Sequence, residues 1–265
     1  MIDFWNPYRA LPAREQRLLG LGSVVAVLVV WAALSASGWF SKNQLPSPWA
    51  VAEALVYLGW YEGKSQLLSA TLWSVGRVAV ASLLVIVIGI PLGVLMGASP
   101  RVNAALSPLI DPFRSAPVAA LLPIMVMWFG IGEFMKIAFL FVGSIVYLTP
   151  LVRDAIRAVP EGYLVSAKDI GATQWECVSK VLIPLAMPRI MDAIIVGVSV
   201  SWTYITVAEY VNAQEGLGQL IANARRLSAM DQVFAGIIVI IAVALLTYQG
   251  LMALKRALYK WETKE

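Results

Sequence analysis

Apolar residues fill six long segments of this chain, and short polar stretches separate them. The segments are Leu18–Leu34, Val78–Met96, one centred on Pro117–Phe129, Ile137–Val152, Ala193–Val207 and Val233–Leu254. An α-helix needs about 20 residues to cross the hydrocarbon core of a membrane, and the shorter segments reach that length with their flanking residues. The pattern predicts an all-α, polytopic membrane protein with six transmembrane helices.

Prolines interrupt several of these segments. Pro117 and Pro123 break the third segment, and Pro91 and Pro150 lie inside the second and fourth. A membrane helix tolerates proline where neighbouring helices satisfy the carbonyl groups that it frees. We therefore expect kinked helices that face protein or a water path.

The polar stretch 159–184 has the local signals of two short helices. Glu161 follows a proline, which suits the first turn of a helix, and Gly171 is placed to end that helix in a left-handed conformation. Thr173 and Glu176 form a T-x-x-E capping box that would start the second helix.

Composition supports the membrane interpretation. Hydrophobic residues make up 60% of the chain, charged residues 14%, and the mean hydropathy is +0.76; about a quarter of a soluble domain is charged. The net charge of +4 therefore indicates basic cytoplasmic segments and no nucleic-acid partner. With Cys177 as the single cysteine and no histidine, the sequence excludes an internal disulfide, histidine-based catalysis and a metal site of the usual zinc type.

The first apolar segment resembles a signal peptide in two respects, since arginines precede it and Ser35-Ala36-Ser37 follows it. Its apolar run is longer than the roughly 7–15 residues of a signal peptide. We interpret it as an uncleaved span.

Lysine and arginine residues set the orientation. If the N-terminus is cytoplasmic, thirteen of them fall on cytoplasmic segments and five on outer ones, which is a strong positive-inside bias. The predicted division is a cytoplasmic segment 1–17, a six-span domain 18–254 with its polar loop 159–184 in the cytoplasm, and a cytoplasmic tail 255–265. The outer five are Lys42, Lys64, Lys136, Arg225 and Arg226.

The polar loop resembles the coupling loop of ATP-binding-cassette importer permeases, whose consensus is E-A-A, three residues, G, nine residues and I-x-L-P. The matching positions are Ser166, Ala167, Gly171, Val181, Ile183 and Pro184. Val165 stands where the family has its glutamate, which puts the familiar carboxylate contact in doubt. The resemblance implies that a cytoplasmic ATPase docks here, on Glu161, Val165, Ser166, Ala167, Lys168, Asp169 and Gly171.

Further matches cover nearly the whole chain and resemble the nitrate, sulfonate, taurine and bicarbonate branch of these permeases. They are Ser47-Pro48, the stretch 116–124, Trp128-Phe129-Gly130-Ile131-Gly132-Glu133, Trp202-Thr203-Tyr204, Ala208-Glu209 and Glu215-Gly216-Leu217-Gly218. The resemblance implies the type I importer fold in a bacterial inner membrane. It also implies a second permease copy, two ATPases that carry the ATP and Mg, and an outer substrate-binding protein. This chain itself would bind no cofactor and catalyse no reaction.

Other interpretations fit the sequence less well. Gly63-Lys64-Ser65 looks like the end of a phosphate-binding loop, but the earlier glycine position holds Leu58 and no strand precedes it. An ion-coupled secondary transporter usually has repeated halves and paired intramembrane carboxylates, and no internal repeat is evident. A membrane-embedded serine protease would need a base to activate its serine, and this chain has no histidine.

Charges near the spans are functional or paired, because burying a charge in lipid is costly. We expect the Arg77 side chain to reach the outer headgroups or to have a functional role. Asp111 and Arg114 are expected to form an ion pair with each other or to line the path. Asp192 is expected to pair with Arg189.

Residues of the fifth span are the other candidates for lining the path, with helix packing as the alternative. The candidates, with Arg114, are Ser199, Trp202, Thr203, Tyr204, Thr206 and Glu209. The resemblance favours a small anionic or zwitterionic solute. One chain with an intact coupling loop can serve both ATPases by two-fold symmetry, so we expect a homodimer with the path along its axis, and a heterodimer with a related permease is the alternative.

Overall fold

The computed structural model describes residues 11–41, 43–60, 65–211 and 214–261, and their regular structure is helical. The residues Lys42, Gly63 and Lys64 of the sequence analysis therefore lie outside the described residues, as do parts of the predicted segments 1–17 and 255–265. The long helices are α1 (Ala13–Ala36), α3 (Gln66–Ala98), α6 (Glu133–Arg157), α9 (Ile183–Tyr210) and α11 (Met230–Leu258), and the shorter ones α2 (Pro48–Gly59), α4 (Pro100–Ile110), α5 (Leu122–Phe129), α7 (Glu161–Asp169), α8 (Gln174–Glu176) and α10 (Leu217–Arg226).

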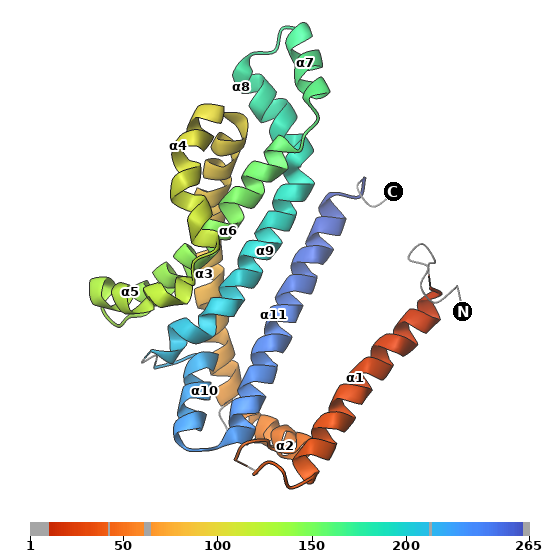
Figure 1. The fold of residues 1–265 in the computed structure, drawn as a ribbon, viewed down its shortest axis with the longest axis vertical. Helices are drawn as coiled ribbons and strands as arrows, with labels where there is room; N and C mark the ends of the chain where they lie inside the picture. The colour runs from red at the N-terminus through yellow and green to blue at the C-terminus, as the bar shows by residue number, and fades with distance from the viewer. Residues whose placement is uncertain (1–10, 42, 61–64, 212–213, 262–265) are drawn as a thin grey trace.

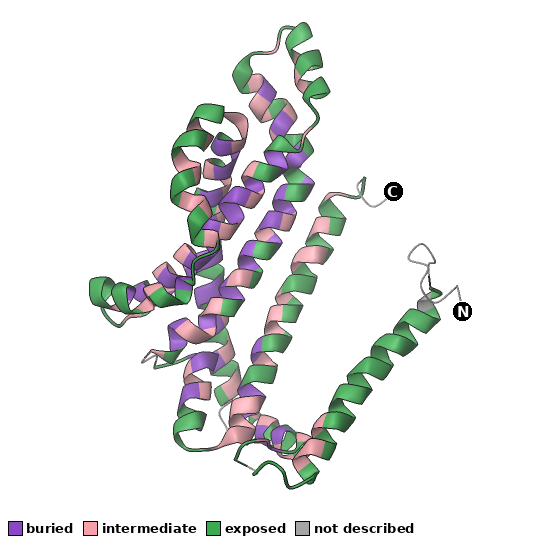
Figure 2. Ribbon diagram, in the orientation of Figure 1, coloured by how far each residue is buried: buried purple, intermediate pink, exposed green. Residues whose placement is uncertain are grey.

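The helices α3, α6 and α9 lie side by side and form the packed centre of the molecule (Figure 1). Buried positions concentrate on their facing sides (Figure 2). Phe139 and Leu140 of α6 are fully buried between the neighbouring helices, together with Ile205 of α9. Burying these side chains supplies the packing that holds the bundle together.

Small residues let the backbones of these helices approach closely. Gly89, Gly93 and Gly97 recur every fourth residue on α3 and face α6. A Cβ added at Gly93 would lie 2.6 Å from the carbonyl oxygen of Thr149. Small residues at this spacing are typical of membrane helix interfaces, where close packing replaces the hydrophobic effect.

The helices at the periphery make fewer contacts with the central bundle. Trp31 of α1 stacks on Phe234 of α11, and its indole nitrogen donates a hydrogen bond to the Pro46 carbonyl. Beyond that contact, α1 stands away from the bundle with its apolar side chains exposed (Figure 2). Its composition and length suit a membrane span, as predicted.

The third apolar segment is not a straight span. Among the described residues, five helices are long and apolar enough to cross a membrane, and a sixth crossing requires the pair Pro100–Arg114 and Val118–Phe129, bent by 95°. The break falls just before Pro117, because this proline cannot donate a backbone hydrogen bond and restricts the residue before it. As Figure 1 shows, α5 then projects sideways from the bundle as an arm.

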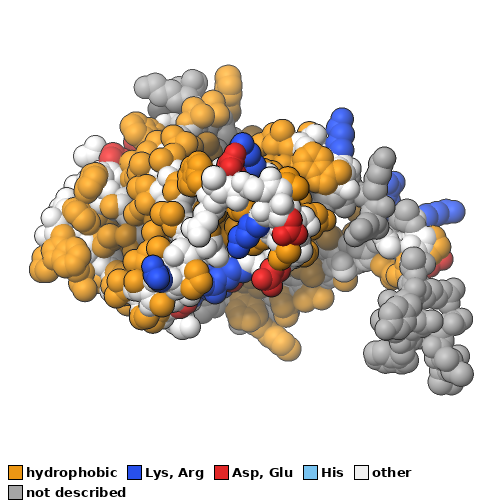
Figure 3. All heavy atoms as spheres, turned by 90° about the horizontal axis from the view of Figure 1, so that it is seen from above, with side chains coloured by type: hydrophobic (Ala, Val, Ile, Leu, Met, Phe, Trp, Pro, Cys, Tyr) orange, Lys and Arg blue, Asp and Glu red, His pale blue; other side chains and the backbone are white. Residues whose placement is uncertain are grey.

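The two ends of the bundle differ. The α7–α8 pair projects at one end, whereas α2 and α10 cover the other (Figure 1). The start of α1 and the end of α11 both point away from α2 and α10. Seen from the α7–α8 end, lysine, arginine and acidic side chains gather among apolar ones (Figure 3).

Replacing Gly93 with alanine tests the close approach of α3 and α6. The added methyl group meets the Thr149 carbonyl and Val152, so we expect the free energy of unfolding to fall by about 1–3 kcal/mol. Gly76→Ala is the matched control, because Gly76 lies on the same helix with nothing within 4 Å of its added Cβ. Thermal unfolding in detergent measures both variants, and equal midpoints would contradict the packing argument.

Candidate functional site

The α7–α8 loop projects beyond the bundle as a helix-turn-helix. Most residues predicted to contact an ATPase are exposed on it, and Ala167 is half-buried. The exposed ones are Glu161, Val165, Ser166, Lys168, Asp169 and Gly171. The loop therefore presents these residues to a partner.

Local sequence explains the shape of this loop. Gly171 has φ +87°, and the amides of Gly171 and Ala172 donate to the carbonyls of Lys168 and Ala167, which is a Schellman ending for α7. Thr173 and Glu176 form the reciprocal capping box that starts α8. Both predictions are confirmed.

The loop is anchored on one side and apolar on the other. Leu164 and Val178 pack against the buried cluster at this end of the bundle. Ile170 and Trp175, in contrast, are 87% and 71% exposed. After α8, a π-helical turn, Cys177–Leu182, carries the chain into α9.

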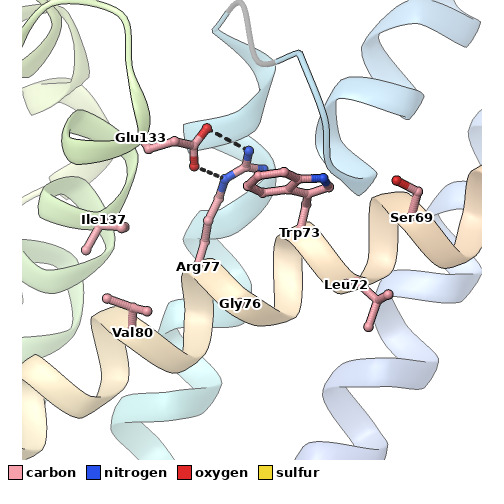
Figure 4. Close-up of a pocket in the computed structure, with 8 residues that line it drawn as sticks. All are labelled: Ser69, Leu72, Trp73, Gly76, Arg77, Val80, Glu133 and Ile137. Carbon is pink, nitrogen blue, oxygen red and sulfur yellow. Dashed lines mark hydrogen bonds and ion pairs between the residues drawn. The ribbon is translucent and has the colours of Figure 1, made fainter.

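At the opposite end, Arg77 occupies a buried ion-pair network. Its side chain is 3% exposed. Nε and Nη2 donate to the Glu133 carboxylate at 2.6 and 2.8 Å, as Figure 4 shows, and Nη1 donates to Glu209 at 2.7 Å. The prediction that Arg77 reaches the headgroups is wrong, because two carboxylates from other helices bind it inside the chain.

The Glu209 side of the network is tightly enclosed. Its carboxylate is fully buried and accepts hydrogen bonds from Ser74 Oγ and the Gly218 amide. Arg77 Nη1 also donates to the Glu215 carbonyl at 2.7 Å. At Gly216, which has φ +125°, an added Cβ would lie 2.5 Å from the Glu209 carboxyl carbon, so only glycine fits this turn.

The network balances its charges. Lys136 is buried and donates to Glu133 at 2.8 Å, so two cations meet two carboxylates. Such pairing is what a charge needs in a low-dielectric interior. It also explains three of the sequence matches, because Glu133, Glu209 and the Glu215–Gly218 turn converge on Arg77.

Glu209 therefore lies inside the chain, and its predicted role in lining a path is not supported in this conformation. The remaining candidates on α9 do not share one face. Ser199 and Thr203 are exposed and donate to their own helix backbone, whereas Trp202 is buried. Thr206 is half-buried and donates to the Thr203 carbonyl.

Tyr204 faces α6 instead, and its ring contacts Phe139 edge-on. Its hydroxyl interacts with Tyr147, whose hydroxyl donates to the Arg114 carbonyl at 3.3 Å. Tyr147 thus joins two of the predicted path residues, Arg114 and Tyr204. Sequence reasoning missed it because its type and position in α6 gave no separate signal.

Two further ion pairs differ from those predicted. Asp111 binds Arg153 of α6 at 2.9 Å, so it does not pair with Arg114. Asp192 binds Lys255 of α11 at 2.8 Å, so its partner is not Arg189. In both cases a residue from another helix reaches the carboxylate.

Comparison with known proteins identifies the family. Residues 89–260 match the family model described as "Binding-protein-dependent transport system inner membrane component". The chain belongs to this family. It is an ATP-binding-cassette importer permease with the type I fold, as the sequence predicted.

Relatives cover nearly its full length. The chain is 33% identical to the taurine transport system permease protein TauC of Escherichia coli, over 94% of this chain and 92% of that one. It is 30% identical to the putative aliphatic sulfonates transport permease protein SsuC of Bacillus subtilis, over 96% and 91%. A structure of the MetNI methionine ABC transporter in an inward-facing conformation matches with a TM-score of 0.65 and 25% identity, over 72% of this chain and 95% of that one.

Removing one partner of the Arg77–Glu209 pair should cost more than removing both. Arg77→Leu leaves the Glu209 carboxylate buried without its cation, and we expect a loss of about 3–5 kcal/mol in the free energy of unfolding. The double variant Arg77→Leu/Glu209→Leu should recover part of that loss. Unfolding in detergent measures both, and a double variant less stable than the single one would contradict the pairing argument.

Proposed function

We propose that this permease is the membrane-spanning subunit of an ATP-driven importer for a small sulfonate such as taurine. Two cytoplasmic ATPases would supply the energy, with ATP and Mg bound on them, and an outer binding protein would deliver the solute. The observation that carries the proposal is the projecting α7–α8 loop in a chain of this family. Alternating access would follow from movement of that loop.

The exposed apolar side chains of the loop support docking. Val165 replaces the glutamate of the family pattern, and both Val165 and Ile170 are exposed. The contact with the ATPase would therefore be mainly apolar, with Glu161 and Asp169 as flanking carboxylates. A short helix that presents apolar anchors suits insertion into a groove of a partner.

Symmetry supports a homodimer. One chain with an intact coupling loop can serve both ATPases through a two-fold axis, and the path would lie along that axis. The exposed apolar surfaces of α1 and α5 leave room for lipid and for a second copy. Both termini would be cytoplasmic, because the cationic residues favour that side.

Arg114 supports an anionic group on the solute. It lies in the short 3₁₀ turn Asp111–Arg114 at the break of the third segment, half-buried beside Tyr147. Its guanidinium forms no ion pair with a described residue, since Asp111 binds Arg153. A guanidinium free to pair suits the oxygens of a sulfonate.

Uptake by the complete complex tests the cargo. We expect ATP-dependent uptake of labelled taurine, and we expect Arg114→Gln to raise its KM about tenfold, because the charge-assisted contact is lost. Lys180→Gln, which removes an exposed loop cation, is the control. Uptake of labelled nitrate and bicarbonate tests the other anions. Robust uptake of a cationic or neutral solute, with no uptake of taurine, nitrate or bicarbonate, would refute the assignment.

Replacing Gly171 with alanine tests coupling. A residue other than glycine at φ +87° costs about 1–2 kcal/mol, so the loop turn should distort and uptake should fall at least fivefold, while the protein still inserts. Gly162→Ala is the control, because Gly162 lies in the same loop with ordinary helical backbone and open space around it. Normal ATP-driven uptake by the Gly171 variant would rule out this coupling role.

A further inference from the structure

The network around Arg77 links the start of α6 to the start of α10, two segments that otherwise make little contact with each other. Arg77 and Ser74 lie on α3, Glu133 is the first residue of α6, and Glu209 lies near the end of α9. The turn into α10 adds the Glu215 carbonyl and the Leu217 amide, which donates to Ser74 Oγ at 2.9 Å. One guanidinium thus binds three other segments at once.

The two sides of this network differ in burial. Glu209 is 0% exposed and its carboxylate has three kinds of donor around it, namely Arg77, Ser74 and the Gly218 amide. The Glu133 side chain is 48% exposed, and a pocket of about 480 Å³ opens beside it (Figure 4). Glu133 can therefore leave Arg77 and keep its bond to Lys136, whereas Arg77 is the only cation paired with Glu209 among the described residues.

Glu133 also stands at the base of the α5 arm. Gly130 has φ +70° and Gly132 is extended, so the turn between α5 and α6 contains two glycines before the first anchored side chain. The Glu133–Arg77 contact is the polar attachment of that turn to α3.

We propose that Arg77 is a positioning residue for transport, because its guanidinium holds the start of α6 and the start of α10 in one relative position. Glu133 is the contact that opens and closes, and Glu209 is the fixed one. The start of α6 and the start of α10 then move together when Glu133 is bound to Arg77, and separately when Glu133 is released. The consequence for transport rests on the proposed function, whereas the joined motion does not.

Glu133→Gln tests the proposal, because it removes the charge and keeps the shape. Hydrogen exchange of the complete complex in lipid nanodiscs reports on both sides of Arg77, since the Leu217 and Gly218 amides are themselves bonded to the network. We expect exchange to rise about fivefold at 130–136 and also at 217–218. Glu133→Asp, which keeps the charge on a shorter side chain, should give a smaller change.

Asp192→Asn is the matched control. Asp192 is 50% exposed and paired with Lys255 at the other end of the bundle, so its loss should change neither segment. A rise confined to 130–136 in Glu133→Gln would show a local contact and overturn the proposal. No rise at either segment would overturn it too.

The transport consequence is measured separately. In Glu133→Gln we expect the ATP hydrolysed per solute imported to rise about fivefold, with the value for Asp192→Asn unchanged. A structural role alone would lower the amount of complex and leave this ratio as it is. If no solute is imported by any variant, the proposed function fails while the exchange result still decides the role of Arg77.

Discussion

The burial of one guanidinium organises the α10 end of this protein. Arg77 sits near the start of a membrane helix and is almost inaccessible, so its charge must be met by groups of the chain itself. The carboxylates that meet it come from two other helices, and the carbonyl comes from a turn. Each of those segments is therefore placed by the requirement to compensate Arg77, and Gly216 is glycine because the same space leaves no room for a side chain.

The half of the bundle toward α7 and α8 is held by a different interaction. There the glycines of α3 bring its backbone against α6, and the contact is made by van der Waals packing without charges. Packing of this kind has little tolerance, since even one methyl group must displace the neighbouring backbone. Ion pairs made by long side chains tolerate more movement, and the Glu133 side chain is 48% exposed. The Glu133 contact is therefore more adjustable than the backbone contact at Gly93.

What the sequence could predict follows from the range of each interaction. The apolar segments, the Gly171 turn and the Thr173–Glu176 capping box depend on residues close together in the chain, and the structure confirms them. The partners of Asp111 and Asp192 could not be predicted, because each comes from a helix at least 42 residues away and local spacing favoured a nearer arginine.

The path residues show a related limit. Their polar or aromatic character predicted that they line the path, but successive residues of a helix point about 100° apart. Trp202, Thr203 and Tyr204 therefore face different neighbours, and Glu209 turned inward to Arg77. Residue type alone does not give the face of a helix. The bend at Pro117 was indicated by the prolines, yet its direction is set by the packing of Asp111 and Tyr147 on the neighbouring segments.

The two ends of the molecule are connected by the same two helices. The helix α6 begins at Glu133 in the Arg77 network and leads directly into the α7–α8 loop, and α9 leaves that loop and ends beside Glu209. These helices have 25 and 28 residues, so each spans about 40 Å. A partner that displaces the loop would act on both helices, and through α6 on the Glu133 carboxylate. Arg77 belongs to α3, so any displacement of α6 relative to α3 must be absorbed where the attachment is adjustable. Glycine packing along α3 restricts this displacement, and in the proposed role of Arg77 the Glu133 contact takes it up while Glu209 stays bound.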